Sequence, residues 1–174
     1  MQLKIFDTFD DNHPELYQDI LNLTGSARQF YPGYEDWFYK TFIPGIKKKE
    51  RLIITAQNET GALIGCALIK NTPSEKKICT LYVKPKYRRQ GIGTTLIRQA
   101  IQIVGEYPLI TVSQENINQL LPFLTRQGFR LSTAKRSLYR TDSIEYLFND
   151  KQTEVIQKRL IPVLVHRAHQ LERY

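Results

Sequence analysis

The spacing of apolar and polar residues predicts an ordered succession of strands and helices. A short alternating strand is expected at 3–9. A helix is expected to begin at Pro14 and to end near Gly25, because proline suits the first turn of a helix and glycine its end. An aromatic-rich second helix is predicted at 33–43, closed by Pro44-Gly45.

Residues 51–105 are predicted to form three strands and a helix. The strands are expected at 51–57, 62–70 and 77–83, separated by turn-forming residues, so that they pair as antiparallel hairpins. A helix is predicted over 92–104, where apolar residues recur at helical spacing and Gly105 supplies the stop.

The remaining elements complete an α/β pattern. A buried strand is predicted at 108–113, then a short helix that ends at Gly128, then two strands in 129–134 and 144–149. The helix between the strand at 77–83 and the one at 108–113 is the kind of crossover that joins parallel strands. The pattern predicts a mixed, mostly antiparallel sheet of six to seven strands flanked by helices.

Composition places the chain among globular proteins. Its 174 residues are 41% hydrophobic, enough for the core of one domain. The longest uncharged apolar run, 63–69, is too short to cross a bilayer, and the first residues do not resemble a signal peptide. Cys66 and Cys79 lie in apolar strands and read as buried thiols. We therefore expect a cytoplasmic protein with no membrane partner.

Positive charge is concentrated away from the N-terminal part. The net charge of +8 divides into −2 for residues 1–50, +6 for 51–110 and +4 for 111–174, counting Lys and Arg against Asp and Glu. Such a balance indicates an anionic ligand, such as a phosphorylated cofactor or nucleic acid. A solvated basic surface is the plain alternative.

The segment 82–93, YVKPKYRRQGIG, places four cations and two glycines between a strand and a helix. The unpaired N–H groups and the dipole of a helix start attract anions, and glycine lets a phosphate approach the main chain. No Gly-Lys-Ser/Thr follows, and the third glycine of a dinucleotide-binding fingerprint is absent. The segment therefore predicts a pyrophosphate-binding turn of another kind.

Arg88-Arg89-Gln90-Gly91-Ile92-Gly93 resembles the R/Q-x-x-G-x-G/A motif of the GCN5-related N-acetyltransferase (GNAT) family. As in that family, an apolar strand, a proline and an aromatic residue precede the motif and an apolar helix follows it. Gly128-Phe129 resembles the start of the family's sixth strand. The succession of elements is similar over 3–148, with strong residue matches in 77–105 and 123–130. The resemblance implies a GNAT-like fold with a splayed pair of parallel strands.

The resemblance also implies acetyl-CoA as acyl donor. In the family, the pantetheine arm pairs with the fourth strand and the pyrophosphate lies on the N–H groups of the turn. The implied contacts are Leu81, Tyr82 and Val83 for the arm, and Arg88, Arg89, Gln90, Gly91, Ile92, Gly93 and Thr94 for the pyrophosphate.

The catalytic positions depart from the family's common pattern. Leu124 stands where many members have a tyrosine acid, and Cys79 where many have a glutamate base. Ser113 is a candidate to assist the leaving thiolate, with helix capping as its alternative role. Tyr139 is a candidate phenolic acid, with packing on the sheet edge as its alternative.

The sequence gives weaker support for a carboxylate base, a cysteine nucleophile or a metal site. Glu50 and Glu115 are candidate bases, with solvated loop carboxylates as the alternative. Cys79 lacks features that would stabilise a thiolate, which argues against a covalent nucleophile. His166 and His169 have no Cys or acidic neighbour to complete a metal site, so no metal is expected.

The aromatic segment 30–39 is the candidate acceptor side, because the family's first helices overhang the acceptor. Aromatic rings beside carboxylates suit a cationic amine. The predicted substrate residues are Tyr31, Tyr34, Glu35 and Asp36, whereas Trp37 and Phe38 are expected in the core.

Residues 150–174 are expected to form an amphipathic helical extension behind an acetyltransferase domain at 1–149. Pro162 should interrupt this helix. Its apolar face would pack on the domain or on a second subunit, which leaves a homodimer open; a basic arm for RNA is the other interpretation.

Together these features favour an N-acetyltransferase that moves an acetyl group from acetyl-CoA to a primary amine of a small molecule or protein. Two alternatives stay open: an acetyltransferase acting on aminoacyl-tRNA, and a CoA-binding module without catalysis.

Overall fold

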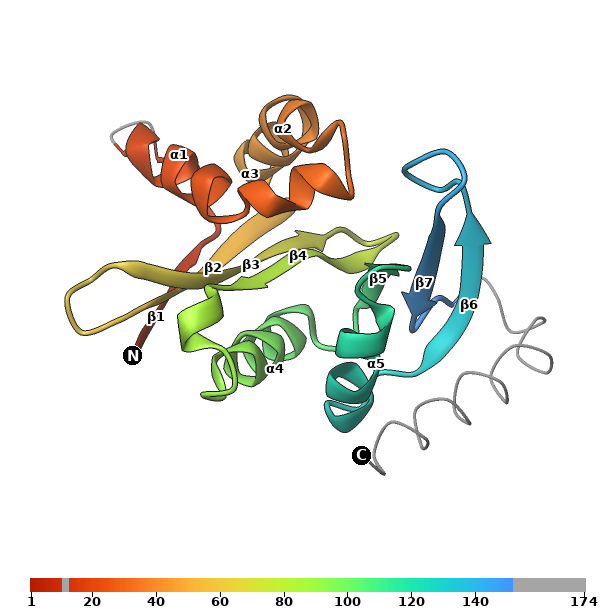
Figure 1. Cartoon of the computed structure of the whole chain (residues 1–174). Coiled ribbons are helices and arrows are strands. Elements are labelled where there is room, and N and C mark those ends of the chain that lie inside the picture. The colour runs from red at the N-terminus through yellow and green to blue at the C-terminus, as the bar shows by residue number, and fades with distance from the viewer. Residues whose placement is uncertain (11–12, 152–174) are drawn as a thin grey trace. The chain divides into compact units, whose positions relative to one another are not determined.

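The computed structural model describes residues 1–10 and 13–151 (Figure 1). The chain divides into two compact units, Met1–Pro108 and a second that begins at Leu109. The predicted extension at 150–174 lies outside the described residues from 152 onward, as do the two histidines and the proline in it.

The first unit contains an antiparallel sheet in the order β1-β2-β3-β4. Its strands are β1 (Gln2–Phe6), β2 (Arg51–Gln57), β3 (Leu63–Asn71) and β4 (Lys76–Val83). The predicted strands and the first hairpin are confirmed, although β1 is shorter than expected. Asn58 closes that hairpin, because its side-chain oxygen accepts hydrogen bonds from the N–H groups of Thr60 and Ala62 at 3.1 and 2.9 Å.

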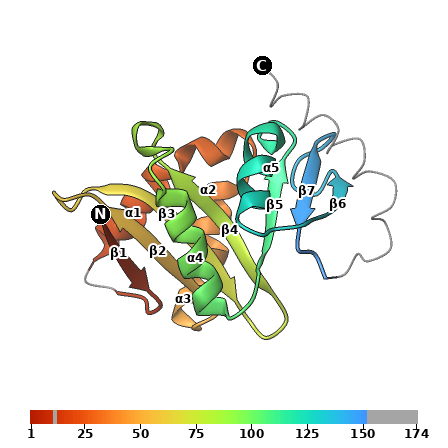
Figure 2. The same cartoon turned by 90° about the horizontal axis from the view of Figure 1, so that it is seen from below.

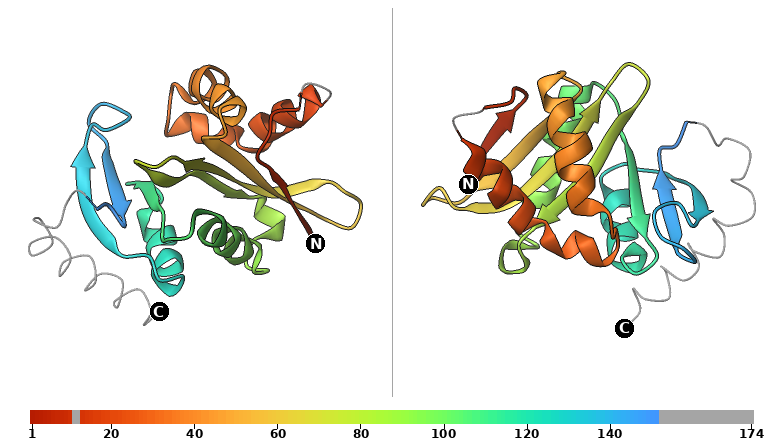
Figure 3. Two further views of the ribbon diagram at one scale, coloured as in Figure 1. Left: turned by 180° about the vertical axis from the view of Figure 1, so that it is seen from behind. Right: turned by 90° about the horizontal axis from the view of Figure 1, so that it is seen from above.

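Helices cover both faces of this sheet (Figures 2 and 3). On one face lie α1 (Pro14–Leu23), the 3-10 turn η1 (Gly25–Gln29), α2 (Tyr34–Trp37), the π-helical turn η2 (Phe38–Phe42) and α3 (Ile43–Lys47). On the other face, α4 (Ile92–Val104) contacts β2, β3 and β4. The helix predicted over 92–104 is confirmed, and Gly105 ends it with φ of 74°.

The predicted end of the second helix at Pro44-Gly45 is wrong. Helical backbone continues from Tyr34 through η2 to Lys47. Pro44 lies in the first turn of α3, where a missing N–H costs least, and the wider turn of η2 precedes it. Phe38 is fully buried and Trp37 packs against the core, as predicted.

One extra residue interrupts the pairing of β4 with β3. Leu68 of β3 lies opposite Thr80 and the next residue, Ile69, lies opposite Ile78. Cys79 is therefore the unmatched residue of a β-bulge, which bends a strand and redirects its side chains. The sequence contains no glycine or proline here that would have indicated it.

The second unit has three antiparallel strands in the order β5-β7-β6. They are β5 (Leu109–Ser113), β6 (Leu131–Arg136) and β7 (Ile144–Phe148), and α5 (Ile117–Arg126) follows β5. All four elements were predicted. Within the described part of the chain, no helix has the length and apolarity needed to cross a membrane.

Gly65 allows β3 to approach the end of β4 closely. A Cβ atom at Gly65 would stand 2.9 Å from the backbone oxygen of Tyr82 and 3.4 Å from Leu96 of α4. We predict that Gly65→Ala lowers stability by about 1–3 kcal/mol, because the backbone of β4 must move. Chemical unfolding of the purified protein measures this.

Gly25→Ala is the matched control. Its new Cβ would meet the end of the flexible Arg28 side chain at 3.9 Å, an ordinary contact. An equal loss of stability in both variants would contradict the packing argument.

Candidate active site

The turn between β4 and α4 is held by local hydrogen bonds. The 3-10 turn η3 (Pro85–Tyr87) follows β4, and the N–H of Arg88 donates to the Pro85 oxygen at 3.1 Å. Arg89 and Gly91 then adopt positive φ values of 60° and 80°. Glycine takes this conformation without a steric cost, so Gly91 suits the residue before α4.

The start of α4 has N–H groups available for a ligand. Within α4, Thr95 is the first residue whose N–H bonds back to the turn, at 2.9 Å from the Gly91 oxygen. The N–H groups of 92–94 precede it and have no intrahelical partner. The first turn of α4 contains no acidic residue, and a Cβ at Gly91 would meet no atom within 4 Å. An anion therefore finds open space, free donors and the positive end of a helix dipole.

The two arginines of the turn differ in role. Arg88 donates from Nε to the Val83 oxygen at 3.0 Å, and its guanidinium lies 5.9 Å from the centre of the Tyr82 ring. Arg88 therefore ties the turn to β4, although its side chain is exposed, as is that of its neighbour Arg89. Gln90 donates to the Lys86 oxygen at 3.2 Å and also stabilises the turn.

The residues expected to meet the pantetheine arm are half-buried at the end of β4. Leu81, Tyr82 and Val83 lie opposite Ala67, Cys66 and Gly65 of β3. Tyr82 packs against the core beneath α1–α3.

Tyr34 of α2 is buried and connects three elements. Its hydroxyl oxygen lies 3.1 Å from Oγ1 of Thr24 and 3.1 Å from Oγ1 of Thr80 on β4. Thr24 in turn donates to the Ile20 oxygen at 2.8 Å. Burial raises the pKa of Tyr34 to about 12. This geometry gives Tyr34 a positioning role, since it fixes α2 on the strand beside the bulge.

The other predicted acceptor residues are arranged differently. Tyr31 is half-buried against the same core. Glu35 pairs with Arg28 at 2.9 Å and Asp36 pairs with Lys40 at 3.0 Å, with both carboxylates more than half exposed. The two carboxylates are thus engaged by neighbouring cations.

Cys79 stays a thiol at neutral pH. Burial raises the pKa of the Cys79 thiol, although Arg51 Nη1 lies 3.8 Å from its sulfur. This agrees with the sequence argument against a nucleophilic thiolate. Glu50, the first of the candidate bases, is exposed.

The candidate residues of the second unit lie around the end of β5. Ser113 is buried, and its Oγ accepts a hydrogen bond from Asn116 Nδ2 at 3.1 Å. Tyr139 is 42% exposed. A hydrogen bond from Arg140 lowers the pKa of Glu115, which makes Glu115 a poor base at neutral pH.

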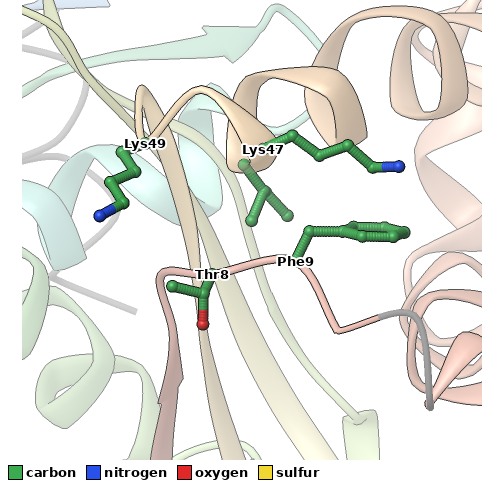
Figure 4. A pocket seen from close by; sticks show the side chains of 5 residues that line it. Thr8, Phe9, Lys47 and Lys49 are labelled. Atoms are coloured by element: carbon green, nitrogen blue, oxygen red, sulfur yellow. The ribbon is translucent and has the colours of Figure 1, made fainter.

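A separate cavity of about 280 Å³ lies between the end of β1 and the end of α3 (Figure 4). It is lined by Thr8, Phe9, Ile46, Lys47 and Lys49, with Lys47 Nζ 4.0 Å from the centre of the Phe9 ring. None of the predicted site residues lines it. In residues 1–10 and 13–151 no group of three or more Cys, His, Asp or Glu is arranged to bind a metal.

The comparisons with known proteins agree with this geometry. The sequence pattern of the Acetyltransferase (GNAT) family matches residues 9–129, well over half of the chain. The chain belongs to the GNAT acetyltransferase family. A search of curated proteins gives no match.

Solved structures share the fold. A GNAT-family protein of Desulfovibrio desulfuricans superposes with a TM-score of 0.63 at 16% identity, covering 84% of this chain and 97% of its own. An aminoglycoside 6'-N-acetyltransferase from Enterococcus faecium gives 0.58 at 14% identity, covering 85% and 95%. The PaiA N-acetyltransferase from Thermoplasma acidophilum, in complex with coenzyme A, gives 0.57 at 17% identity, covering 84% and 98%. These likenesses confirm the predicted fold class.

The buried hydroxyl of Tyr34 generates a stability prediction. We predict that Tyr34→Phe lowers the free energy of unfolding by about 0.5–1.5 kcal/mol, because one hydrogen-bonding group between Thr24 and Thr80 is lost. Tyr39→Phe is the control, since Tyr39 is 43% exposed and bonds to exposed Gln18. Equal effects of the two variants in urea unfolding would refute the assignment.

Alkaline pH provides a second test of Tyr34. Its pKa is raised from 10 to about 12 in the folded protein, so the unfolded chain loses this proton first. The stability that Tyr34 contributes is complete below pH 10 and declines as pH rises towards 12. We predict a steeper decline for the wild type than for Tyr34→Phe over this range, measured by unfolding at each pH. Parallel curves would argue against a buried hydroxyl.

Proposed function

We propose that the protein is an acetyl-CoA-dependent N-acetyltransferase whose acceptor is the primary amine of a small molecule or protein. The observation that carries the proposal is the start of α4, which directly follows the glycine turn in a chain of the GNAT family. The N–H groups of 92–94 and the exposed Arg89 would hold the pyrophosphate of CoA. Arg88 would hold the turn in place through its hydrogen bond to the Val83 oxygen.

Acetyl-CoA supplies a thioester: the amine nitrogen bonds to its carbonyl carbon, the carbon–sulfur bond breaks, and the nitrogen's proton replaces the acetyl group on sulfur. The main chain of Leu81 to Val83 would orient the donor and stabilise the charge that develops on the carbonyl oxygen. The amine must first be neutral, since alkyl amines are protonated at pH 7.

We assign the acceptor to the face of β4 beneath α1–α3. Tyr31 contributes a half-buried ring there, and Tyr34 holds Thr80 in place. The carboxylates of Glu35 and Asp36 are exposed and would attract a cationic amine from solvent towards this face. Ser113 and Tyr139 remain the proposed residues for assisting the thiolate, with Ser113 the better enclosed of the two.

Binding of acetyl-CoA is tested by two glycine variants at opposite ends of α4. Gly91 and Gly105 have φ of 80° and 74°, and a Cβ at either would meet no atom within 4 Å. Gly91→Glu and Gly105→Glu therefore introduce similar backbone strain, but only the first puts a negative charge at the proposed pyrophosphate position.

We predict that acetyl-CoA at a hundredfold excess over its Kd stabilises the wild type by about 2.7 kcal/mol, a rise of several degrees in Tm. Gly105→Glu should keep this rise and Gly91→Glu should lose it. A thermal scan with and without acetyl-CoA measures both. No rise in the wild type at saturating acetyl-CoA would refute the donor assignment.

Amine-dependent release of free thiol from acetyl-CoA tests transfer itself. A thermal rise without release of thiol to any amine would favour the CoA-binding module over the enzyme. Release of thiol with aminoacyl-tRNA but not with small amines or peptides would favour an acetyltransferase that acts on aminoacyl-tRNA.

A further inference from the structure

The loop between β6 and β7, residues 137–143, is closed by its own hydrogen bonds. The N–H of Ser137 donates to the Ser143 oxygen at 2.8 Å, and the N–H of Asp142 donates to the Ser137 hydroxyl at 3.1 Å. Ser137 and Asp142 have φ of 54° and 56°, a conformation that residues other than glycine adopt rarely and that is common at functional sites. These bonds hold the loop in a tight conformation.

The tip of this loop exposes two large side chains. Leu138 is 40% exposed and Tyr139 is 42% exposed, whereas Ser143 at the base of the loop is buried. The Ser143 hydroxyl donates to the backbone oxygen of Arg140, the residue after Tyr139, at 2.6 Å. Ordered loops on a rigid scaffold are frequent carriers of binding and catalytic residues. Tyr139 is therefore presented to solvent by a loop whose backbone is fixed.

An ion pair joins the loop to the end of β5. Arg140 donates from Nη2 to Oε1 of Glu115, and the two side chains are 28% and 36% exposed. The N–H of Gln114 donates to the Ile144 oxygen at 2.9 Å, and the N–H of Ile144 donates to the Gln114 side chain at 3.0 Å. The loop and the segment after β5 are thus connected by both main chain and side chains.

Glu115 connects the loop with Ser113 as well. Ser113 is buried, and its Oγ accepts a hydrogen bond from Asn116 Nδ2 at 3.1 Å. A hydroxyl group that accepts one hydrogen bond keeps its proton for another acceptor. Hydrogen bonds from Arg140 and, to a smaller extent, from Ser113 lower the pKa of Glu115. The carboxylate therefore lies beside both Ser113 and the arginine that follows Tyr139.

We propose that Glu115 and Arg140 are positioning residues, whose ion pair holds Tyr139 at the end of β5 so that Tyr139 and Ser113 act on the same leaving thiolate. The inference rests on the proposed function. Hydroxyl groups that donate to the sulfur stabilise its negative charge until the proton lost by the amine reaches it through solvent. Such donors are effective when they are fixed before the reaction, because no free energy is then spent on ordering them.

Single-turnover release of thiol tests the proposal on the full chain, with enzyme in excess over acetyl-CoA. Spermidine, kanamycin and a lysine-containing peptide are the acceptors, and the one acetylated fastest is used throughout. Glu115→Gln and Arg140→Gln should each lower the rate about tenfold and change the Kd of acetyl-CoA by less than about twofold. Arg140→Lys should recover part of the rate, since it keeps the charge but not the planar fork.

Asp142→Asn is the matched control. It also removes one negative charge, and asparagine tolerates the φ of 56° in the same loop. This variant should leave the rate unchanged. In a double-mutant cycle, Tyr139→Phe should lower the rate, and adding Glu115→Gln should lower it by less than about twofold more, because the ion pair acts through Tyr139.

Proteolysis measures the anchoring of the loop independently of activity. Chymotrypsin cleaves after large apolar and aromatic residues, and cleavage after Leu138 or Tyr139 is mapped by mass spectrometry. Glu115→Gln should raise the rate of this cleavage roughly tenfold, because the released loop opens more frequently. Asp142→Asn should be cleaved at the rate of the wild type.

Several outcomes would overturn the inference while leaving the proposed transfer in place. These are an unchanged rate in Glu115→Gln or in Tyr139→Phe, independent losses in the double variant, or unchanged cleavage of the loop in Glu115→Gln. If the protein binds acetyl-CoA but no amine releases thiol, the proposed transfer fails and the inference fails with it.

Discussion

The unmatched residue in β4 is the constraint on which the candidate site depends. Because Cys79 has no partner on β3, β4 bends there, and both Cys79 and Thr80 lie on the face covered by α1–α3. Thr80 meets the hydroxyl of Tyr34, and Cys79 meets the guanidinium of Arg51. A regular strand would direct one of these two neighbours to the opposite face. The bulge thus allows β4 to contact Tyr34 of α2 and Arg51 of β2 through two consecutive residues.

Beyond the bulge, close packing around Gly65 determines where β4 ends and the turn before α4 begins. Gly65 lets the Tyr82 backbone and Leu96 of α4 both lie close to β3, just before the chain enters the turn. The turn then leads into a helix start with no acidic residue in its first turn. Both arginines of this turn are exposed, and only Arg88 has a described hydrogen bond from its side chain to β4. The position of the anion-attracting start of α4 therefore depends on the packing of Gly65 against the end of β4 and on the hydrogen bond from Arg88 to Val83.

Most of the fold was predictable from sequence, and the misses have a physical reason. Periodicity gave the helix at 92–104 and the strands, since a buried face imposes its own spacing on the chain. The bulge at Cys79 could not be predicted from the sequence, because one extra residue does not interrupt the run of apolar residues in the strand. The helix at 34–47 was cut short because Pro44 reads as a stop, whereas a π turn before it removes the conflict. Tyr34 stays a predicted substrate residue; its hydrogen bonds to Thr24 and Thr80 could not be predicted, because the sequence does not show which tyrosine hydroxyls are buried.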